Sequence, residues 1–299
     1  MESPLVVGVD GSDPALEALD WAVDEAVRHG LPLRVVHASL WERYEGAVPS
    51  WTTDRPPGQV LAEHVVATAA ERARRRAPGL GVTTAVLAEE PAAGLLAEAR
   101  TAAAVVVGSR GRGAFAGLLL GSVGLVVAAR SPGPVVVVRG DRYALESRHG
   151  RVLLGVGEHG ADAAAVRCAF REAAVRDAEL DAVRAWRRPA RTPADHPLLT
   201  GDEGGPDERH ATGLLERLLE PAAREHPGVR LRRSTVEGPA HRVLTERSAA
   251  ADLLVVEARR RAGPVGLELG RVAHRALHHA SCPVAVVPRR EPEDAEADR

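Results

Sequence analysis

The chain has 299 residues, a formal net charge of −2 and 45% hydrophobic residues. At about 100–200 residues per domain, this length predicts two domains, each large enough to bury a core. Basic and acidic side chains nearly cancel, at 39 against 41, and only 3% of residues are aromatic, so we expect no nucleic-acid partner. The sequence contains no lysine, which excludes a P-loop NTPase and Schiff-base chemistry.

Cysteine usage and hydropathy indicate the compartment. Cys168 and Cys282 are the two cysteines, and neither belongs to a Cys-x-x-Cys pair, which argues against a disulfide scaffold or a thiolate metal site. The N-terminus lacks the basic region and long apolar core of a signal peptide. The longest uncharged run, 113–129, is shorter than the about 20 residues of a spanning helix and contains several glycines. We therefore expect a cytoplasmic protein without a membrane segment, and interpret this run as a loop followed by a buried helix.

The first half begins with an apolar strand that ends at Asp10, followed by a helical pattern. Asp13 is the expected N-cap, Pro14 suits the first helical position, and Gly30 ends the helix. One face of this helix carries the apolar residues Leu16, Leu19, Val23 and Val27.

Further strands are predicted at 33–38, 104–107 and 134–138, with a loop rich in proline, glycine and aspartate at 39–58. The arginine cluster at 72–76 ends a helix, where cations oppose the negative end of the helix dipole. We interpret it as a solvated helix terminus rather than a nucleic-acid patch.

The second half repeats this order once. A strand at 152–157 precedes a helical stripe that contains Val166 and Phe170, and the later apolar runs correspond to those of the first half. These later runs are 180–185, 253–256 and 283–287. Self-similarity at a single long offset indicates domain duplication rather than a solenoid, whose units are about 20–50 residues long.

Each half is expected to contain five strands and four helices. The strands are continuously apolar, which predicts a parallel sheet with helices on both faces, a doubly wound α/β fold. Ligands of such sheets bind beyond the carboxyl ends of the strands. The expected divisions are domain 1 (1–140), a linker (141–150), domain 2 (151–289) and a disordered charged tail (290–299); a second long loop is expected at 186–210.

The chemistry concentrates after the fourth strand, in the pattern Gly108-x2-Gly111-x9-Gly121-Ser122. The first two glycines let the backbone turn sharply and approach a ligand. Gly121 and Ser122 open the next helix, whose free N–H groups and dipole form an anion site suited to phosphates. Two arginines in the loop could add charge-assisted bonds, Arg110 and Arg112.

Asp10 ends the first strand at the same predicted edge of the sheet. Its carboxylate could accept hydrogen bonds from ribose hydroxyls or face the adenine. The Asp-Gly-Ser sequence at 10–12 equally suits a turn residue that caps the helix. The glycine loop, predicted on the same edge, favours the ligand role.

These features resemble the universal stress protein family, and within it the ATP-binding branch. The resemblance is carried by the run Val6 to Ser12, by the glycine-serine pattern and by the closing strand Pro134 to Val138, and it covers nearly the whole chain as two tandem domains. It implies a Rossmann-like fold of the adenine nucleotide alpha-hydrolase type, with ATP as ligand. It also implies pairing through the final strands, either between the two domains or in a homodimer.

The resemblance also implies which residues surround the nucleotide. Those that would line the nucleotide and touch the adenine are Gly8, Val9, Asp10 and Ala38. Those that would wrap the ribose and phosphates are Val107, Gly108, Arg110 and Gly111, and those that would hold the phosphates are Gly121, Ser122, Val123 and Gly124. Mg²⁺ could accompany ATP, but no carboxylate is placed for it.

The second half keeps the fold signature but loses the site. Gly157 stands at the position of Asp10. Three charged residues stand at the positions of Gly108, Gly111 and Ser122, in that order Glu257, Arg260 and Arg271. Glu257 would bring negative charge to the phosphate position, whereas Arg271 could either fill that position or pair with Glu257. We expect no ATP in the second half.

Other motifs are weaker. The run 111–116 matches a dinucleotide fingerprint but follows the fourth strand rather than the first, which argues against NAD. His274 and His278 could face one side of a helix as zinc ligands, but no third ligand is evident.

We find no general base beside the phosphate site, so we expect no enzyme, or at most a slow ATPase. Two functions remain: a nucleotide-binding stress or signalling protein, and a nucleotide-independent interaction scaffold. The anion site alone cannot distinguish ATP from AMP or cyclic AMP.

Overall fold

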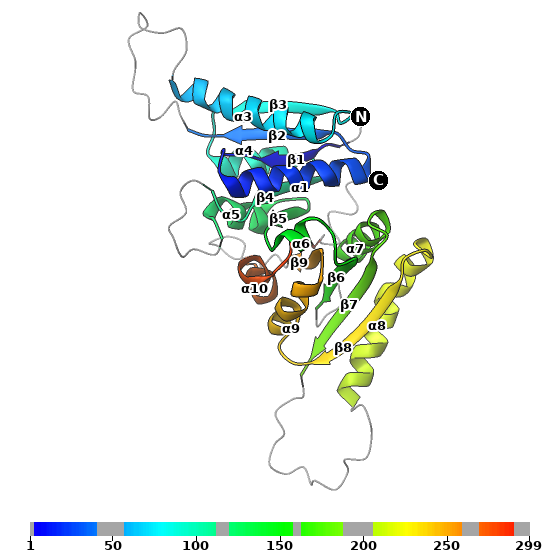
Figure 1. Ribbon diagram of the computed structural model, residues 1–299. Helices are drawn as coiled ribbons and strands as arrows, with labels where there is room; N and C mark the ends of the chain where they lie inside the picture. The colour runs from blue at the N-terminus through cyan, green and yellow to red at the C-terminus, as the bar shows by residue number, and fades with distance from the viewer. Residues whose placement is uncertain are drawn as a thin grey trace, which may run out of the picture.

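The computed structural model describes residues 3–40, 57–111, 120–157, 163–187, 206–258 and 269–289. Within them, the two halves repeat one order of strands and helices (Figure 1). The first half contains β1 (Leu5–Gly8), α1 (Asp13–His29), β2 (Leu33–Ala38), α3 (Pro57–Arg76), β3 (Val82–Leu87), α4 (Pro91–Glu98), β4 (Ala104–Gly108), α5 (Ser122–Arg130) and β5 (Val135–Val138). The second half contains β6 (Arg151–Val156), α7 (Ala163–Val175), β7 (Glu179–Trp186), α8 (Pro206–Glu225), β8 (Leu231–Glu237), α9 (Ala240–Arg247), the short 3-10 helix η2 (Ser248–Ala250), β9 (Leu253–Ala258), α10 (Arg271–His279) and β10 (Val284–Pro288).

The ten strands of the described residues form one sheet, in the order β3-β2-β1-β4-β5-β10-β9-β6-β7-β8. The five strands of each half are parallel, which confirms the predicted architecture. The two halves join where β5 pairs antiparallel with β10 and Val136 lies opposite Ala285. The final strands of this chain therefore pair with each other.

Helices cover both faces of the sheet, which explains the continuously apolar strands. In β1, Leu5 and Val7 belong to one core cluster, whereas Val6 belongs to the other. Residues of α1, α3, α7 and α8 contribute to the first cluster, and residues of α4, α5, α9 and α10 to the second. Burying each Val or Leu side chain contributes about 1.5–3 kcal/mol. Among the described helices, none has the length and apolarity needed to cross a bilayer.

The first helix differs in two details from its predicted pattern. Its N-cap is Ser12, whereas Asp13, the predicted cap, is already helical. Gly30 ends the helix as predicted, in the left-handed conformation with φ 65°. Val27 is 56% exposed, so it does not share one face with the buried Leu19 and Val23 as predicted. Each step of four residues advances about 40° beyond a full turn, and two such steps carry Val27 away from the face of the buried Leu19.

The arginine cluster ends α3 as predicted, but two of its members are held by α1. Arg72 donates to Asp20 at 2.6 and 2.7 Å, and Arg76 donates to Asp24 at 2.7 Å. The cluster therefore packs against a neighbouring helix in addition to facing solvent.

The predicted linker is not entirely irregular. It contains the one-turn helix α6 (Arg142–Leu145), because the Asp141 side chain accepts a hydrogen bond from Ala144 N at 2.9 Å. Both predicted long loops are shorter than expected, since α3 begins at Pro57, β7 extends to Trp186 and α8 begins at Pro206. Predictions for 41–56, 112–119 (with Arg112), 188–205, Arg260 and the tail at 290–299 fall outside the described residues.

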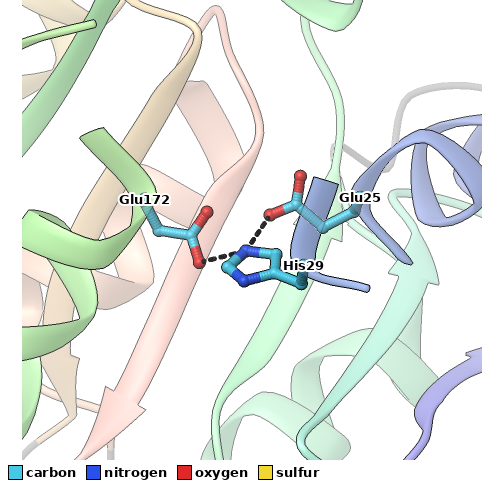
Figure 2. Close-up of side chains that lie close together, drawn as sticks. All are labelled: Glu25, His29 and Glu172. Carbon is cyan, nitrogen blue, oxygen red and sulfur yellow. Dashed lines mark ion pairs between the residues drawn. The ribbon is translucent and has the colours of Figure 1, made fainter. Parts of the chain in front are cut away.

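A buried polar cluster joins the two halves at α1 and α7, and we call it the interdomain clamp: Glu25, His29, Glu172 and Arg176. Figure 2 shows His29 between the two carboxylates, with its Nε2 atom 3.3 Å from Glu25 Oε1 and 3.2 Å from Glu172 Oε1. Arg176 Nη2 lies 2.6 Å from Glu25 Oε2, and Arg176 also pairs with Glu172. Two carboxylates thus share the guanidinium and the imidazole between the domains.

Candidate functional site

The strand order places a topological switch point at the ends of β1 and β4. These strands are neighbours, and the chain leaves them in opposite directions across the sheet, to β2 and to β5. Such a switch point is where doubly wound sheets bind ligands. Gly8 and Gly108, which end these two strands, therefore mark the candidate site.

Asp10 lies two residues beyond the end of β1, rather than at its last position. Its Oδ1 accepts hydrogen bonds from Ser12 N at 2.9 Å and from Ser12 Oγ at 2.6 Å, so the turn role is observed. Its Oδ2 faces the glycine loop, because a methyl group at Gly111 would lie 2.5 Å from that oxygen. The structure thus brings Asp10 and Gly111 into contact, and one carboxylate oxygen borders the loop.

The glycine loop is fastened to the start of α5. Gly121 N donates to Ser109 O at 2.8 Å, and Ser109 N donates to Val138 O at 3.1 Å. Helix α5 begins at Ser122, as predicted, and Gly121 is its N-cap; a methyl group at Gly121 would lie 3.6 Å from Arg110 Cα. Helix geometry leaves the first amides of α5 without intrahelical partners. These amides belong to Ser122, Val123 and Gly124, next to the loop.

Gly108 has a packing role that the sequence did not predict, and its role toward a ligand stays a prediction. A methyl group at this position would lie 2.6 Å from Pro14 O and 2.8 Å from Pro14 C. The first turn of α1 therefore packs directly on the end of β4, and the missing side chain serves this contact.

We expect Gly108→Ala to lower the free energy of unfolding by about 2 kcal/mol, because backbone atoms of α1 must move to admit the methyl group. Urea denaturation measures the change. Gly79→Ala is the matched control, since nothing lies within 4 Å of a methyl group there. Equal stabilities for the two variants would contradict this packing role.

The remaining predicted residues extend along the same edge of the sheet. Val9 N donates to Val36 O at 2.9 Å, and Val107 Cγ1 would lie 3.6 Å from a methyl group at Gly8. Ala38 lies next to α4, where a methyl group at Gly94 would lie 3.1 Å from its Cβ, and it pairs with Leu87 of β3. Sequence reasoning missed His37, whose Nδ1 lies 2.7 Å from Val9 O and so ties the end of β2 to this turn.

The equivalent edge of the second half carries different chemistry. Gly157 follows β6 where Asp10 follows β1. Glu257 of β9 pairs with Arg289 at 3.6 Å. Arg271 is the first residue of α10, where Ser122 begins α5. The second half therefore has the same switch-point position with different charges around it.

Comparison with known proteins covers both halves. A sequence model of the universal stress protein family matches residues 1–139 and 149–288. A universal stress protein of Mycolicibacterium smegmatis is 32% identical over 297 residues, 96% of this chain and 97% of its own. Another, from Mycobacterium tuberculosis, is 40% identical over 139 residues, 46% of each chain. The crystal structure of a universal stress protein from Archaeoglobus fulgidus has the same fold, with a TM-score of 0.70 at 18% identity, over 96% of this chain and 98% of that chain.

Proposed function

Because the chain belongs to the universal stress protein family, as two tandem copies of its domain, we propose that it binds an adenine nucleotide, ATP, in its first domain. The nucleotide regulates a stress response or a signalling partner rather than serving as a substrate. Such regulation requires that the nucleotide bind one conformation of the protein better than another.

The contact between Asp10 and Gly111 carries this proposal. The loop approaches the Asp10 carboxylate so closely that a methyl group at Gly111 would lie 2.5 Å from Oδ2, too close to be accommodated without a shift. Asp10 Oδ2 lies at the rim of the loop, where it can accept a hydrogen bond from a ribose hydroxyl. The first amides of α5 and the Arg110 side chain supply the charge complement for phosphates.

We propose little or no hydrolysis. Asp10 Oδ1 already accepts two hydrogen bonds from Ser12, which fixes the carboxylate as a binding group instead of a base that activates water. Mg²⁺ would enter with the phosphates of ATP and not through a dedicated carboxylate cage.

Isothermal titration calorimetry with ATP tests the site. We expect about one nucleotide per chain, and an affinity at least about tenfold lower in Gly121→Asp, because a new carboxylate at the start of α5 repels phosphate. Asp10→Ala should also weaken binding through loss of the ribose contact. Gly270→Asp is the matched control, since Gly270 caps α10 at the equivalent place in the second half.

Unchanged ATP affinity in both first-domain variants would remove this assignment. The alternative is then an interaction scaffold of the same fold that needs no nucleotide. Two ATP molecules per chain, with Gly270→Asp abolishing one of them, would instead contradict the proposed asymmetry between the domains.

A further inference from the structure

Three side chains of the interdomain clamp carry atoms that commonly ligate metal ions, and they face one another (Figure 2). Glu25, His29 and Glu172 each offer one ligand atom, and these three atoms lie within 4.8 Å of one another. Among the residues that the structure describes, no other group of three or more histidine, cysteine, aspartate and glutamate side chains meets this condition. The group is drawn from both halves, with Glu25 and His29 on α1 and Glu172 on α7.

The distances within this group fit a tetrahedral metal centre. His29 Nε2 lies 3.3 Å from Glu25 Oε1 and 3.2 Å from Glu172 Oε1. Zn²⁺ holds imidazole nitrogen and carboxylate oxygen atoms at about 2.0–2.2 Å, and two ligands of a tetrahedral ion are then about 3.3–3.6 Å apart. The nitrogen and the two oxygens are therefore spaced nearly as zinc ligands are, and an ion needs only a small adjustment of these side chains.

Arg176 orients both carboxylates from their other side. Its Nη2 donates to Glu25 Oε2 at 2.6 Å, and its Nη1 donates to Glu172 Oε2. The guanidinium thus occupies one oxygen of each carboxylate, whereas the other oxygen, Oε1, faces His29. Carboxylates that ligate metals are commonly held by such outer donors, which fix their direction.

The charges around the group favour a cation. With His29 neutral, two carboxylates and one guanidinium sum to one negative charge, and the side chains of Glu25 and Arg176 are 5% and 2% exposed. The group lies in the last two turns of α1 and the last turn of α7, where the helix dipoles direct their negative ends. The side chains of His29 and Glu172 each retain 13% exposure, so an ion can reach the ligand atoms from solvent.

We propose that Glu25, His29 and Glu172 bind a divalent transition-metal ion, Zn²⁺, which links the two halves of the chain at α1 and α7. His29 Nε2 and the two Oε1 atoms ligate the ion, Arg176 keeps the carboxylates in position, and a water molecule takes the fourth place. Metal ligands must give up their protons. The ion therefore takes the place of the proton on His29, and protein kept with a chelator is the form that carries this proton.

This metal site is separate from the proposed nucleotide site. Helix α1 leaves the carboxyl end of β1 and returns to β2, which begins at Leu33 opposite Leu5, the first residue of β1. The last turns of α1 therefore lie at the amino ends of the strands, whereas Gly8 and Gly108 end β1 and β4 at the opposite edge of the sheet. The metal ligands include none of the groups proposed to bind the nucleotide, so the proposal holds whether or not ATP binds.

Titration of Zn²⁺ against a competing chelator tests the proposal on the full-length protein after its metal has been removed by dialysis. We expect one Zn²⁺ per chain at this site, and an affinity at least about 100-fold lower in His29→Gln, because loss of an outer-shell partner alone costs about 10–100-fold. Glu172→Gln, on the other helix, should weaken binding to a similar extent. His274→Gln is the matched control, because it removes an exposed histidine of α10 that lies one turn from His278.

Two measurements on the wild type do not depend on the folding of a variant. X-ray absorption of the zinc complex should show nitrogen and oxygen ligands at about 2.0–2.2 Å and no sulfur at about 2.3 Å. In NMR spectra, Zn²⁺ should shift the ring resonances of His29 and leave those of the exposed His64 and His274 in place.

The inference is overturned if His29→Gln binds Zn²⁺ as tightly as the wild type, or if His274→Gln loses the binding. It is also overturned if the zinc complex contains sulfur ligands, or if the His29 ring resonances do not move. Equal competition by Mg²⁺ would contradict it too, because a nitrogen ligand favours zinc over magnesium, and would indicate an adventitious ion only.

Discussion

Replacing Arg176 with alanine should lower the free energy of unfolding by about 3–5 kcal/mol, because two buried carboxylates of the interdomain clamp lose their shared guanidinium. The side chains of Arg176 and Glu25 are 2% and 5% exposed, so water cannot replace the lost charge. Arg176 also lies over the ring of Trp21, 5.9 Å from its centroid, and this packing is lost as well. Urea denaturation measures the change.

An exposed ion pair provides the matched control. Arg224 pairs with Glu220 one turn earlier in α8, and both side chains are well exposed to solvent. Arg224→Ala should therefore change stability by less than about 0.5 kcal/mol. A variant that combines Arg176→Met with Glu25→Gln and Glu172→Gln should recover much of the lost stability, because no buried charge is then left uncompensated. If Arg176→Ala proves as mild as Arg224→Ala, the clamp does not join the domains.

The central strands could be predicted from the sequence because helices bury them on both faces. The run Val135–Val138 is buried at every position, and its apolar pattern is continuous. The edge strands β3 and β8 could not be located in the same way. Each carries two adjacent exposed polar residues, such as Thr83 and Thr84 in β3, because a strand at the sheet edge is only partly covered.

The candidate site was predictable only in part, because some of its features are local in sequence and others depend on strand pairing. Glycine spacing after β4 indicated the loop and the start of a helix at Gly121 and Ser122, since both are local signals. The contact of Asp10 with Gly111 depends on how β1 and β4 pair, which places Val7 opposite Val106 and which no local pattern encodes. The interdomain clamp is still more remote, because 151 residues separate Glu25 from Arg176.

Stability should decline as pH rises from about 6.5 toward about 9, because the clamp requires a protonated His29. Hydrogen bonds to Glu172 and Glu25, opposed by burial, raise the pKa of His29 from 6.5 to about 9. Because the pKa of His29 is higher in the folded than in the unfolded protein, its protonation stabilises the fold fully at pH values below the unfolded-state pKa. This contribution disappears as the pH rises through the folded-state pKa. At about 1.4 kcal/mol for each tenfold change in proton affinity, a protonated His29 contributes on the order of 3 kcal/mol to the free energy of unfolding.

Urea denaturation at a series of pH values measures how steeply the free energy of unfolding falls with pH, in the wild type and in His29→Gln. The variant should be less stable than the wild type at pH 6, and its stability should vary less between pH 6.5 and 9, because its side chain carries no titrating proton. His64→Gln removes an exposed histidine of α3 and should keep the wild-type slope. If His29→Gln keeps the wild-type dependence of stability on pH, a group other than His29 causes that dependence. The α1–α7 contact would then rest on Arg176 alone, with two carboxylates facing one guanidinium.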